Sequence, residues 1–365
     1  MTERISLILP PILALISAAI IIAVGLESSG ISAPEVFSAL WAGAAGDFYR
    51  LSETAVKACP LLLTGLAVML ALHAGVWNIG AEGQLLVGAL ATAWVGQYTE
   101  IMSPFIAIPL ACFVASLAGM CWASCPAFLK QQHGVNEVIS TIMLNFIALY
   151  IVSYGVHGPL METAGQYPQT DPLPVTTTLP RLFPPTRFHL GIPFAILVAG
   201  LVWIFLFRTK SGFRLRATGA NPIAARFAGF PVEREIMRAF LLSGALAGLA
   251  GAIEVSGVTQ RVYEKFSPGY GYTAIAVALV GQRSPIGVVL AALFFGALEA
   301  GASAMQRTVG VSSVLAAVIQ ATVVLFLAAY STNITQRFIK RVYVPLLFFA
   351  MSSILSFITR RGPVA

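Results

Sequence analysis

Apolar runs of about 20 residues recur along nearly the whole chain, from residue 5 to beyond residue 330, and short polar joints separate them. A run of this length crosses the hydrocarbon layer of a bilayer as an α-helix. Of the 365 residues, 58% are hydrophobic and only 10% are charged, whereas about 25% of the residues in an average soluble domain are charged. A soluble core has no room for so much apolar surface. The pattern predicts an all-α fold, namely a polytopic transmembrane helix bundle.

Ten apolar segments are candidate membrane spans. They cover residues 5–24, 55–74, 84–96, 104–129, 138–156, 191–207, 239–257, 272–280, 286–305 and 312–329. The segments 84–96 and 272–280 are too short to cross as straight helices, so we expect each to be broken or re-entrant. We expect about 9–11 membrane segments in all, forming a single domain over residues 1–365.

The lysines and arginines gather in a few joints, and such a distribution predicts how a membrane protein is oriented. With the N-terminus in the cytoplasm, the positions inside are Arg4, Lys130, Arg208, Lys210, Arg214, Arg216, Arg226, Arg234, Arg238, Arg283, Arg337, Lys340 and Arg341. The smaller set outside is Arg50, Lys57, Arg181, Arg187, Arg261, Lys265 and Arg307. The net charge of +7 therefore indicates orientation and no nucleic-acid partner. The tail, 331–365, is either one more span or a helix lying at the interface.

Seven prolines interrupt residues 157–190, which excludes a regular helix or a central strand there. They are Pro159, Pro168, Pro172, Pro174, Pro180, Pro184 and Pro185. The orientation makes this segment an external loop. A loop of this length is either a docking surface for a periplasmic partner or a solvated connector.

The cytoplasmic joint 208–238 contains the signals of one short helix. Asn221 is a good N-cap, Pro222 suits the first helical position, and Gly229 suits a left-handed exit. Ile223 and Phe227 share one face. A helix of about two turns is unstable alone in water. It either rests on lipid headgroups or inserts into a groove of a partner protein.

The segment 75–84 places polar residues and glycines between two apolar runs. Irregular backbone at membrane depth persists only where protein or a water-filled cavity surrounds it. We expect a structural polar bend at Gly80, Glu82 and Gly83, with Glu82 bonding to backbone N–H groups in preference to solute. Trp77 faces the pathway or anchors the chain at the interface.

Further polar residues lie inside apolar runs. Asn145 falls about two turns into the helix that Asn136 caps, so its amide bonds to a neighbouring helix or to passing solute. Glu254 and Glu299 are intramembrane acids and therefore candidate functional residues, although Glu254 is near enough to the outer end of its run to reach water. The four cysteines indicate apolar packing and no metal site.

Three stretches resemble the permease subunits of bacterial ABC importers for branched-chain amino acids, simple sugars and nucleosides, most of all the nucleoside and simple-sugar group. They are Pro60 to Ala67 with Asn78 to Gln84, Asn136 to Asn145, and Arg216 to Pro222. The last resembles the cytoplasmic coupling loop, which implies an ATPase-coupling role for Gly219, Asn221, Pro222, Ile223, Arg226, Phe227 and Gly229.

The resemblance implies a transporter that works by alternating access in the bacterial inner membrane. Its partners would be two cytoplasmic ATPase subunits, a second permease subunit, identical or homologous, and a periplasmic or lipid-anchored solute-binding protein, all at the membrane lipid. The chain has no phosphate-binding loop of its own. We therefore expect no enzymatic activity and no cofactor in this subunit. The alternative function is a secondary carrier or channel.

The predicted spans contain no cluster of lysines or arginines to neutralise an anionic solute. A neutral polar solute is favoured, a nucleoside first and a simple sugar second. Candidate pathway residues are amides for hydrogen bonding and rings for stacking. They are Trp77, Asn78, Gln84, Asn145 and Phe146.

Overall fold

The computed structural model describes residues 2–330, with side chains from residue 13 onward except at 327 and 328. Every regular element in this part of the chain is helical, and its only β-structure is two isolated bridges. The predicted all-α helix bundle is confirmed. Among the described residues, six helices are long and apolar enough to cross a membrane. The two alternatives for the tail, 331–365, concern residues outside the described range.

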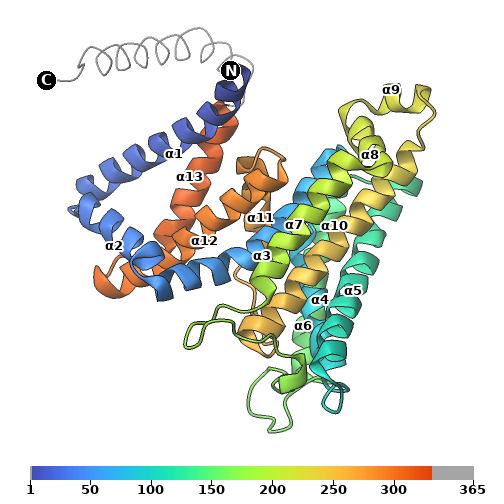
Figure 1. Ribbon diagram of the computed structural model, residues 1–365, viewed down its shortest axis with the longest axis horizontal. Helices are drawn as coiled ribbons and strands as arrows, with labels where there is room; N and C mark the ends of the chain where they lie inside the picture. The colour runs from blue at the N-terminus through green and yellow to red at the C-terminus, as the bar shows by residue number, and fades with distance from the viewer. Residues whose placement is uncertain (1, 331–365) are drawn as a thin grey trace, which may run out of the picture. The chain divides into compact units, whose positions relative to one another are not determined.

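The helices are labelled in Figure 1. In chain order they are α1 Thr2–Ser28, α2 Ala33–Ala45, α3 Phe48–His73, α4 Ala81–Gly96, α5 Pro104–His133, α6 Glu137–His157, the 3-10 turn η1 Val175–Thr177, α7 Gly191–Arg208, α8 Lys210–Ala220, α9 Pro222–Phe227, α10 Val232–Glu254, the π-helix η2 Val255–Thr259, α11 Tyr270–Val280, α12 Pro285–Thr308 and α13 Val314–Tyr330. The sequence did not predict α2 and α8, because neither contains an apolar run long enough to span a bilayer.

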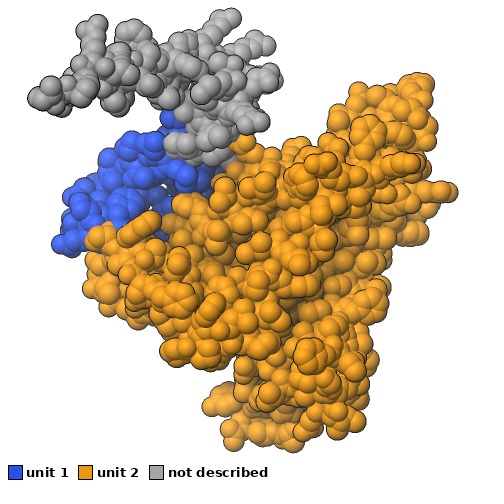
Figure 2. All heavy atoms as spheres, viewed as in Figure 1, with its two compact units in different colours: residues 1–37, 314–365 blue, residues 38–313 orange. Residues whose placement is uncertain are grey.

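The chain divides into two compact units (Figure 2). The first unit comprises residues 1–37 and 314–365, and within it α1 lies beside α13. The hydroxyl oxygens of Ser17 and Tyr330 are 2.7 Å apart across this pair. The second unit comprises residues 38–313 and contains every element considered below. A single domain over 1–365 stays a prediction.

Helix α3 lies at the centre of the second unit. Of its most apolar 18-residue stretch, 89% is buried, whereas the buried share of the corresponding stretch in α5 is 22%. Helix α10 packs on α3, α4 and α5, and α12 packs on α3. The backbones of α5 and α10 touch, since a β-carbon on Gly119 would be 2.2 Å from the carbonyl oxygen of Gly244. Small residues allow such close approach between membrane helices.

Two apolar helices of the second unit are short, as predicted. Helix α4 has 16 residues and α11 has 11. At about 1.5 Å per residue both are shorter than the hydrocarbon layer, which is about 30 Å thick. Both begin within the unit, and their N-terminal ends are close together: Gly271 of α11 lies against the backbone of Glu82 in α4.

Candidate functional site

The bend between α3 and α4 is held by side-chain amides. The Asn78 amide nitrogen donates to the Gln84 side-chain oxygen at 2.9 Å and to the Ser243 hydroxyl at 2.7 Å. The Asn78 side-chain oxygen accepts from the Gly80 backbone N–H at 3.0 Å. Buried polar groups need such partners. Asn78 therefore fastens the bend to the start of α4 and to α10.

The first turn of α4 is also bonded to two other helices. The Asn145 side chain of α6 accepts from the Gly83 backbone N–H at 2.8 Å and donates to the Ile79 carbonyl at 2.9 Å. The Glu82 carboxylate accepts from the Gly271 backbone N–H of α11 at 2.6 Å. An acid that bonds to backbone amides is what we predicted for Glu82, but the amide comes from another helix and not from the bend itself.

The predicted pathway residues fall into two groups. Asn78, Gln84 and Asn145 are at most 1% exposed, and their amides are bonded within the chain. Trp77 and Phe146 are 40% and 49% exposed and lie outside this network. Direct contact of these five residues with solute stays a prediction. In this conformation the three amides connect the bend to α4, α6 and α10.

The short helix predicted after residue 220 is present as α9. The Asn221 side chain accepts from the backbone N–H groups of Ile223 and Ala224 at 3.1 and 3.0 Å, and Pro222 is the first helical residue. Gly229 has a left-handed φ of +80°. Phe227 is 91% exposed. The local sequence signals thus produce a capped helix with an exposed apolar face.

The residues of this helix that were assigned to ATPase coupling lie on the surface, and one of them is braced. Ile223 is 68% exposed, on the same helix as Phe227. Arg226 forms an ion pair with Glu233 at the start of α10. Both side chains of this pair are exposed, and exposed ion pairs contribute little to stability.

Helix α8 connects α9 directly to the α3–α4 bend. Gly219, in its last turn, lies on the backbone of that bend: a β-carbon there would be 2.1 Å from the His73 carbonyl oxygen and 2.7 Å from the Gly75 nitrogen. Gly75 has a φ of +78°. The coupling segment and the polar bend, predicted as separate features, are therefore in contact.

A cavity of about 560 Å³ lies where α10 gives way to η2 and α11 begins. Its volume is within the range of ligand pockets, which is about 300–1,000 Å³. Its lining residues are Lys57, Arg187, Glu254, Val258, Thr259, Tyr263, Lys265, Phe266, Pro268 and Tyr270. A π-helix often marks a functional site, and η2 supplies Val258 and Thr259. The cavity combines aromatic rings with one buried acid.

Glu254, the last residue of α10, is 5% exposed. Its carboxylate accepts from the Tyr270 hydroxyl at 3.4 Å. None of the ion pairs among the described side chains includes Glu254. The Thr259 hydroxyl is buried and has no hydrogen-bond partner within residues 2–330. The cavity therefore contains polar groups whose bonding capacity the chain itself leaves largely unused.

The charges around the cavity are mixed in sign. Arg187 is paired with Glu53. Lys57 is close enough to act electrostatically on Glu254 and on Glu299 of α12. Two of the three cations on the cavity wall, Arg187 and Lys57, therefore have acids beside them, and the third is Lys265.

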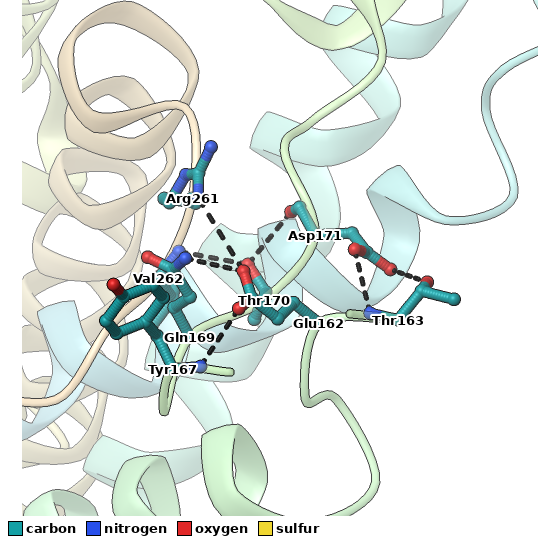
Figure 3. Close-up of polar contacts among 8 residues, drawn as sticks. All are labelled: Glu162, Thr163, Tyr167, Gln169, Thr170, Asp171, Arg261 and Val262. Atoms are coloured by element: carbon teal, nitrogen blue, oxygen red, sulfur yellow. Dashed lines mark hydrogen bonds and ion pairs between the residues drawn. The ribbon is translucent and has the colours of Figure 1, made fainter. Parts of the chain in front are cut away.

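The α6–α7 loop, residues 158–190, is bonded to Arg261 and Val262, which directly precede a cavity residue (Figure 3). The Thr170 backbone N–H donates to the Val262 carbonyl at 2.8 Å, and the Val262 N–H donates to the Thr170 hydroxyl at 3.1 Å. Arg261 and Glu162 form an ion pair at 3.9 Å. The next residue, Tyr263, lines the cavity. A movement of this loop would therefore move the cavity wall.

Most of this cavity was not predicted from the sequence. Glu254 was a candidate functional residue, with the alternative that its side chain simply reaches water, and residues 258–270 had no predicted role in binding. The signal was present as three aromatic residues within the eight positions 263–270, downstream of an intramembrane acid; they are Tyr263, Phe266 and Tyr270. Their convergence depends on the π-helix and on Gln260, whose φ is +55°, and neither follows from apolar periodicity.

No cluster of three or more His, Cys, Asp or Glu side chains lies together in the described part of the chain. The four cysteines are free, with Cys59 buried and Cys121 and Cys125 exposed. Packing, which the sequence suggested for all four, therefore fits Cys59 and not the two exposed ones.

Known proteins share these features of sequence. A family described as branched-chain amino acid transport system, permease component, matches residues 50–329. A guanosine ABC transporter permease of Bacillus subtilis is 40% identical over 90% of this chain and 95% of its own length. A glucose ABC transporter permease of Haloferax volcanii is 37% identical over 93% and 90%, and a nucleoside ABC transporter permease of Lactococcus lactis is 29% identical over 90% and 92%. No solved structure matches the chain.

Proposed function

Because the chain belongs to this permease family, whose similar members are ABC transporter permeases, we propose that it carries a neutral nucleoside across the bacterial inner membrane. The chain is a multi-pass membrane protein. In the proposed complex it pairs with a second permease subunit, identical or homologous, within membrane lipid. Two cytoplasmic ATPase subunits supply the energy, and a periplasmic or lipid-anchored protein delivers the solute.

The observation that carries the choice of solute is the cavity beside Glu254. Its aromatic residues, Tyr263, Phe266 and Tyr270, suit the flat face of a nucleobase, which a sugar lacks. Two of the similar permeases are named for guanosine or nucleosides and one for glucose. A nucleoside is therefore ranked first and a simple sugar second.

The proposed docking site for the ATPase is the exposed face of α9. Phe227 and Ile223 present apolar surface that the described chain does not cover. A large aromatic side chain at the centre of an interface often contributes much of the binding energy. The basic residues of α8 and α9 agree with a cytoplasmic position for this end of the helices, while the α6–α7 loop would face the binding protein.

The contacts suggest how ATPase movements reach the solute. A push on α9 is transmitted through α8 to Gly75, because Gly219 rests on that backbone. The bend is fastened to α4 by Asn78, and Glu82 of α4 holds the Gly271 N–H next to Tyr270 of the cavity. Alternating access would follow if these elements shift as a unit. The pathway amides predicted from the sequence would then serve this transmission, and contact with solute remains to be tested.

The test is uptake into proteoliposomes. The chain reconstituted with its ATPase subunits and binding protein should accumulate labelled guanosine when ATP is supplied, and the chain alone should not. Excess unlabelled nucleosides should compete, and a pentose or hexose should not. Uphill uptake by the chain alone, driven by a proton or sodium gradient, would instead identify a secondary carrier. Competition only by sugars would reverse the ranking of solutes.

A further inference from the structure

We infer that Glu254 is a specificity-determining residue, and that its carboxylate accepts two hydrogen bonds from adjacent N–H groups of the solute, as the guanine edge of guanosine provides. The inference rests on the proposed nucleoside function and goes beyond it by naming the base and the residue that recognises it. It concerns the cavity between η2 and α11.

The first step is the hydrogen bonding of the carboxylate. Glu254 is almost fully buried, yet its one side-chain hydrogen bond among the described residues is the 3.4 Å contact from Tyr270. A carboxylate offers about four acceptor positions when it is ionised. A buried carboxylate is costly unless those positions are used. A solute with two donors side by side would complete the bonding of Glu254.

The second step is the wall that would hold a base. The rings of Tyr263 and Phe266 are 6.2 Å apart, centroid to centroid, at an interplanar angle of 77°. Tyr270, which reaches Glu254 through its hydroxyl, lines the same cavity. Aromatic faces bind any nucleobase by stacking and do not distinguish one base from another. Discrimination must therefore come from the polar groups.

The third step is the match between donors and acceptors. Guanine presents a ring N–H and an exocyclic amino group side by side, and both can point at one carboxylate. Adenine presents an acceptor nitrogen beside its amino group, and uracil presents one N–H between two carbonyls, so each would aim a lone pair at Glu254. The buried Thr259 hydroxyl, which has no partner among the described residues, is a second polar group available to the solute. A carboxylate in this cavity therefore favours guanosine.

The test compares initial rates of guanosine and adenosine uptake by the reconstituted complex, at concentrations that saturate the binding protein with each nucleoside. Glu254→Gln should lower the guanosine rate by roughly ten- to a hundredfold, because it removes a charge-assisted pair of bonds, while adenosine uptake falls much less. The matched control is Glu235→Gln. Glu235 is a buried acid at the other end of α10 that does not line the cavity, so the ratio of the two rates should not change.

A second variant keeps the inference testable if Glu254→Gln does not fold. Tyr270→Phe preserves the ring and frees one acceptor position on Glu254, so the preference for guanosine should be kept or increased. Loss of that preference in a folded Tyr270→Phe protein would overturn the inference, because Glu254 would keep its carboxylate without selecting guanosine. Equal losses of guanosine and adenosine uptake in Glu254→Gln would overturn the role of Glu254 alone. Wild-type uptake of a pentose but of no nucleoside would overturn the proposed function.

Discussion

Gly219 and Gly75 meet backbone to backbone. A β-carbon on Gly75 would be 3.1 Å from the Gly219 Cα, and one on Gly219 would be 2.7 Å from the Gly75 nitrogen. Side chains at either position would separate α8 from the bend that precedes α4. The contact joins α8, which leads directly into α9, to the bend that contains Asn78.

The first prediction is that Gly219→Ala impairs the transmission of force. The added methyl group must push α8 off the His73 carbonyl, 2.1 Å away, and such overpacking typically costs about 1–3 kcal/mol. Solute uptake should fall several-fold while the ATPase subunits still bind and hydrolyse ATP. Uptake and ATP hydrolysis by the purified complex are the two measurements. Gly200→Ala in α7 is the matched control, because a β-carbon there has no neighbour within 4 Å. If uptake relative to ATP hydrolysis is the same in the Gly219→Ala and Gly200→Ala complexes, the Gly219–Gly75 contact does not transmit the ATPase movement.

The second prediction concerns the exposed face of α9. Phe227→Ala removes the largest apolar side chain of that helix, and Gly229→Val disfavours its left-handed exit. Both should weaken co-purification of the ATPase subunits or uncouple hydrolysis from uptake, and neither should reduce the yield of inserted permease. The control is Phe105→Ala at the start of α5, where the side chain is also 91% exposed. If ATPase binding and uptake are unchanged in both the Phe227→Ala and the Gly229→Val protein, α9 lies on the membrane surface and does not couple the ATPase to transport.

Local signals and apolar patterns were sufficient for much of the fold. Asn221, Pro222 and Gly229 act on their own neighbours, so a capped helix could be predicted from them alone. The long spans were predicted because about 20 consecutive apolar residues have few other structures available.

Tertiary pairing could not be predicted in this way. Nothing in the sequence indicates that Asn145 reaches Gly83, or that Glu82 accepts from Gly271, 189 positions further along the chain. Glu254 was visible as a costly buried acid, but the cavity beside it is formed by a π-helix. A π-helix changes the direction in which every later side chain points, and apolar periodicity in the sequence does not reveal this change.

The third prediction follows from the pairing of Asn145. Asn145→Leu leaves the Gly83 N–H and the Ile79 carbonyl without their side-chain partner, and each orphaned buried group costs about 1–3 kcal/mol. We expect a lower melting temperature of the purified protein as well as reduced uptake. Phe146→Leu, at an exposed neighbouring position, is the control and should change stability little. Unchanged melting with lost uptake would instead favour direct contact between Asn145 and the solute.

The last prediction uses the pH dependence of the α6–α7 loop, which ends at a buried histidine. His189 is 1% exposed, and its ring lies against η2, where a β-carbon on Gly257 would be 2.7 Å from the imidazole. Neither ring nitrogen has a hydrogen-bond partner among the described residues. Burial, and secondarily the positive charge of Arg187, lower the pKa of His189 from 6.5 to about 4.

Because the unfolded loop binds a proton below pH 6.5 and the folded loop does so only below about pH 4, the stability of the folded loop is lost as pH falls through this window, by roughly 3 kcal/mol in total. The side chain of Asp171 titrates outside this pH range. Hydrogen bonds from Thr163 hold its pKa below the ordinary 3.8, so its contribution disappears only at still lower pH.

Hydrogen exchange of residues 158–190, corrected for intrinsic rates, should therefore show lower protection at pH 5 than at pH 7.5. His189→Leu should abolish the difference, and His157→Leu, at an exposed position, should preserve it. Equal protection of the wild-type loop at both values would mean that His189 accepts a proton without leaving its place against Gly257.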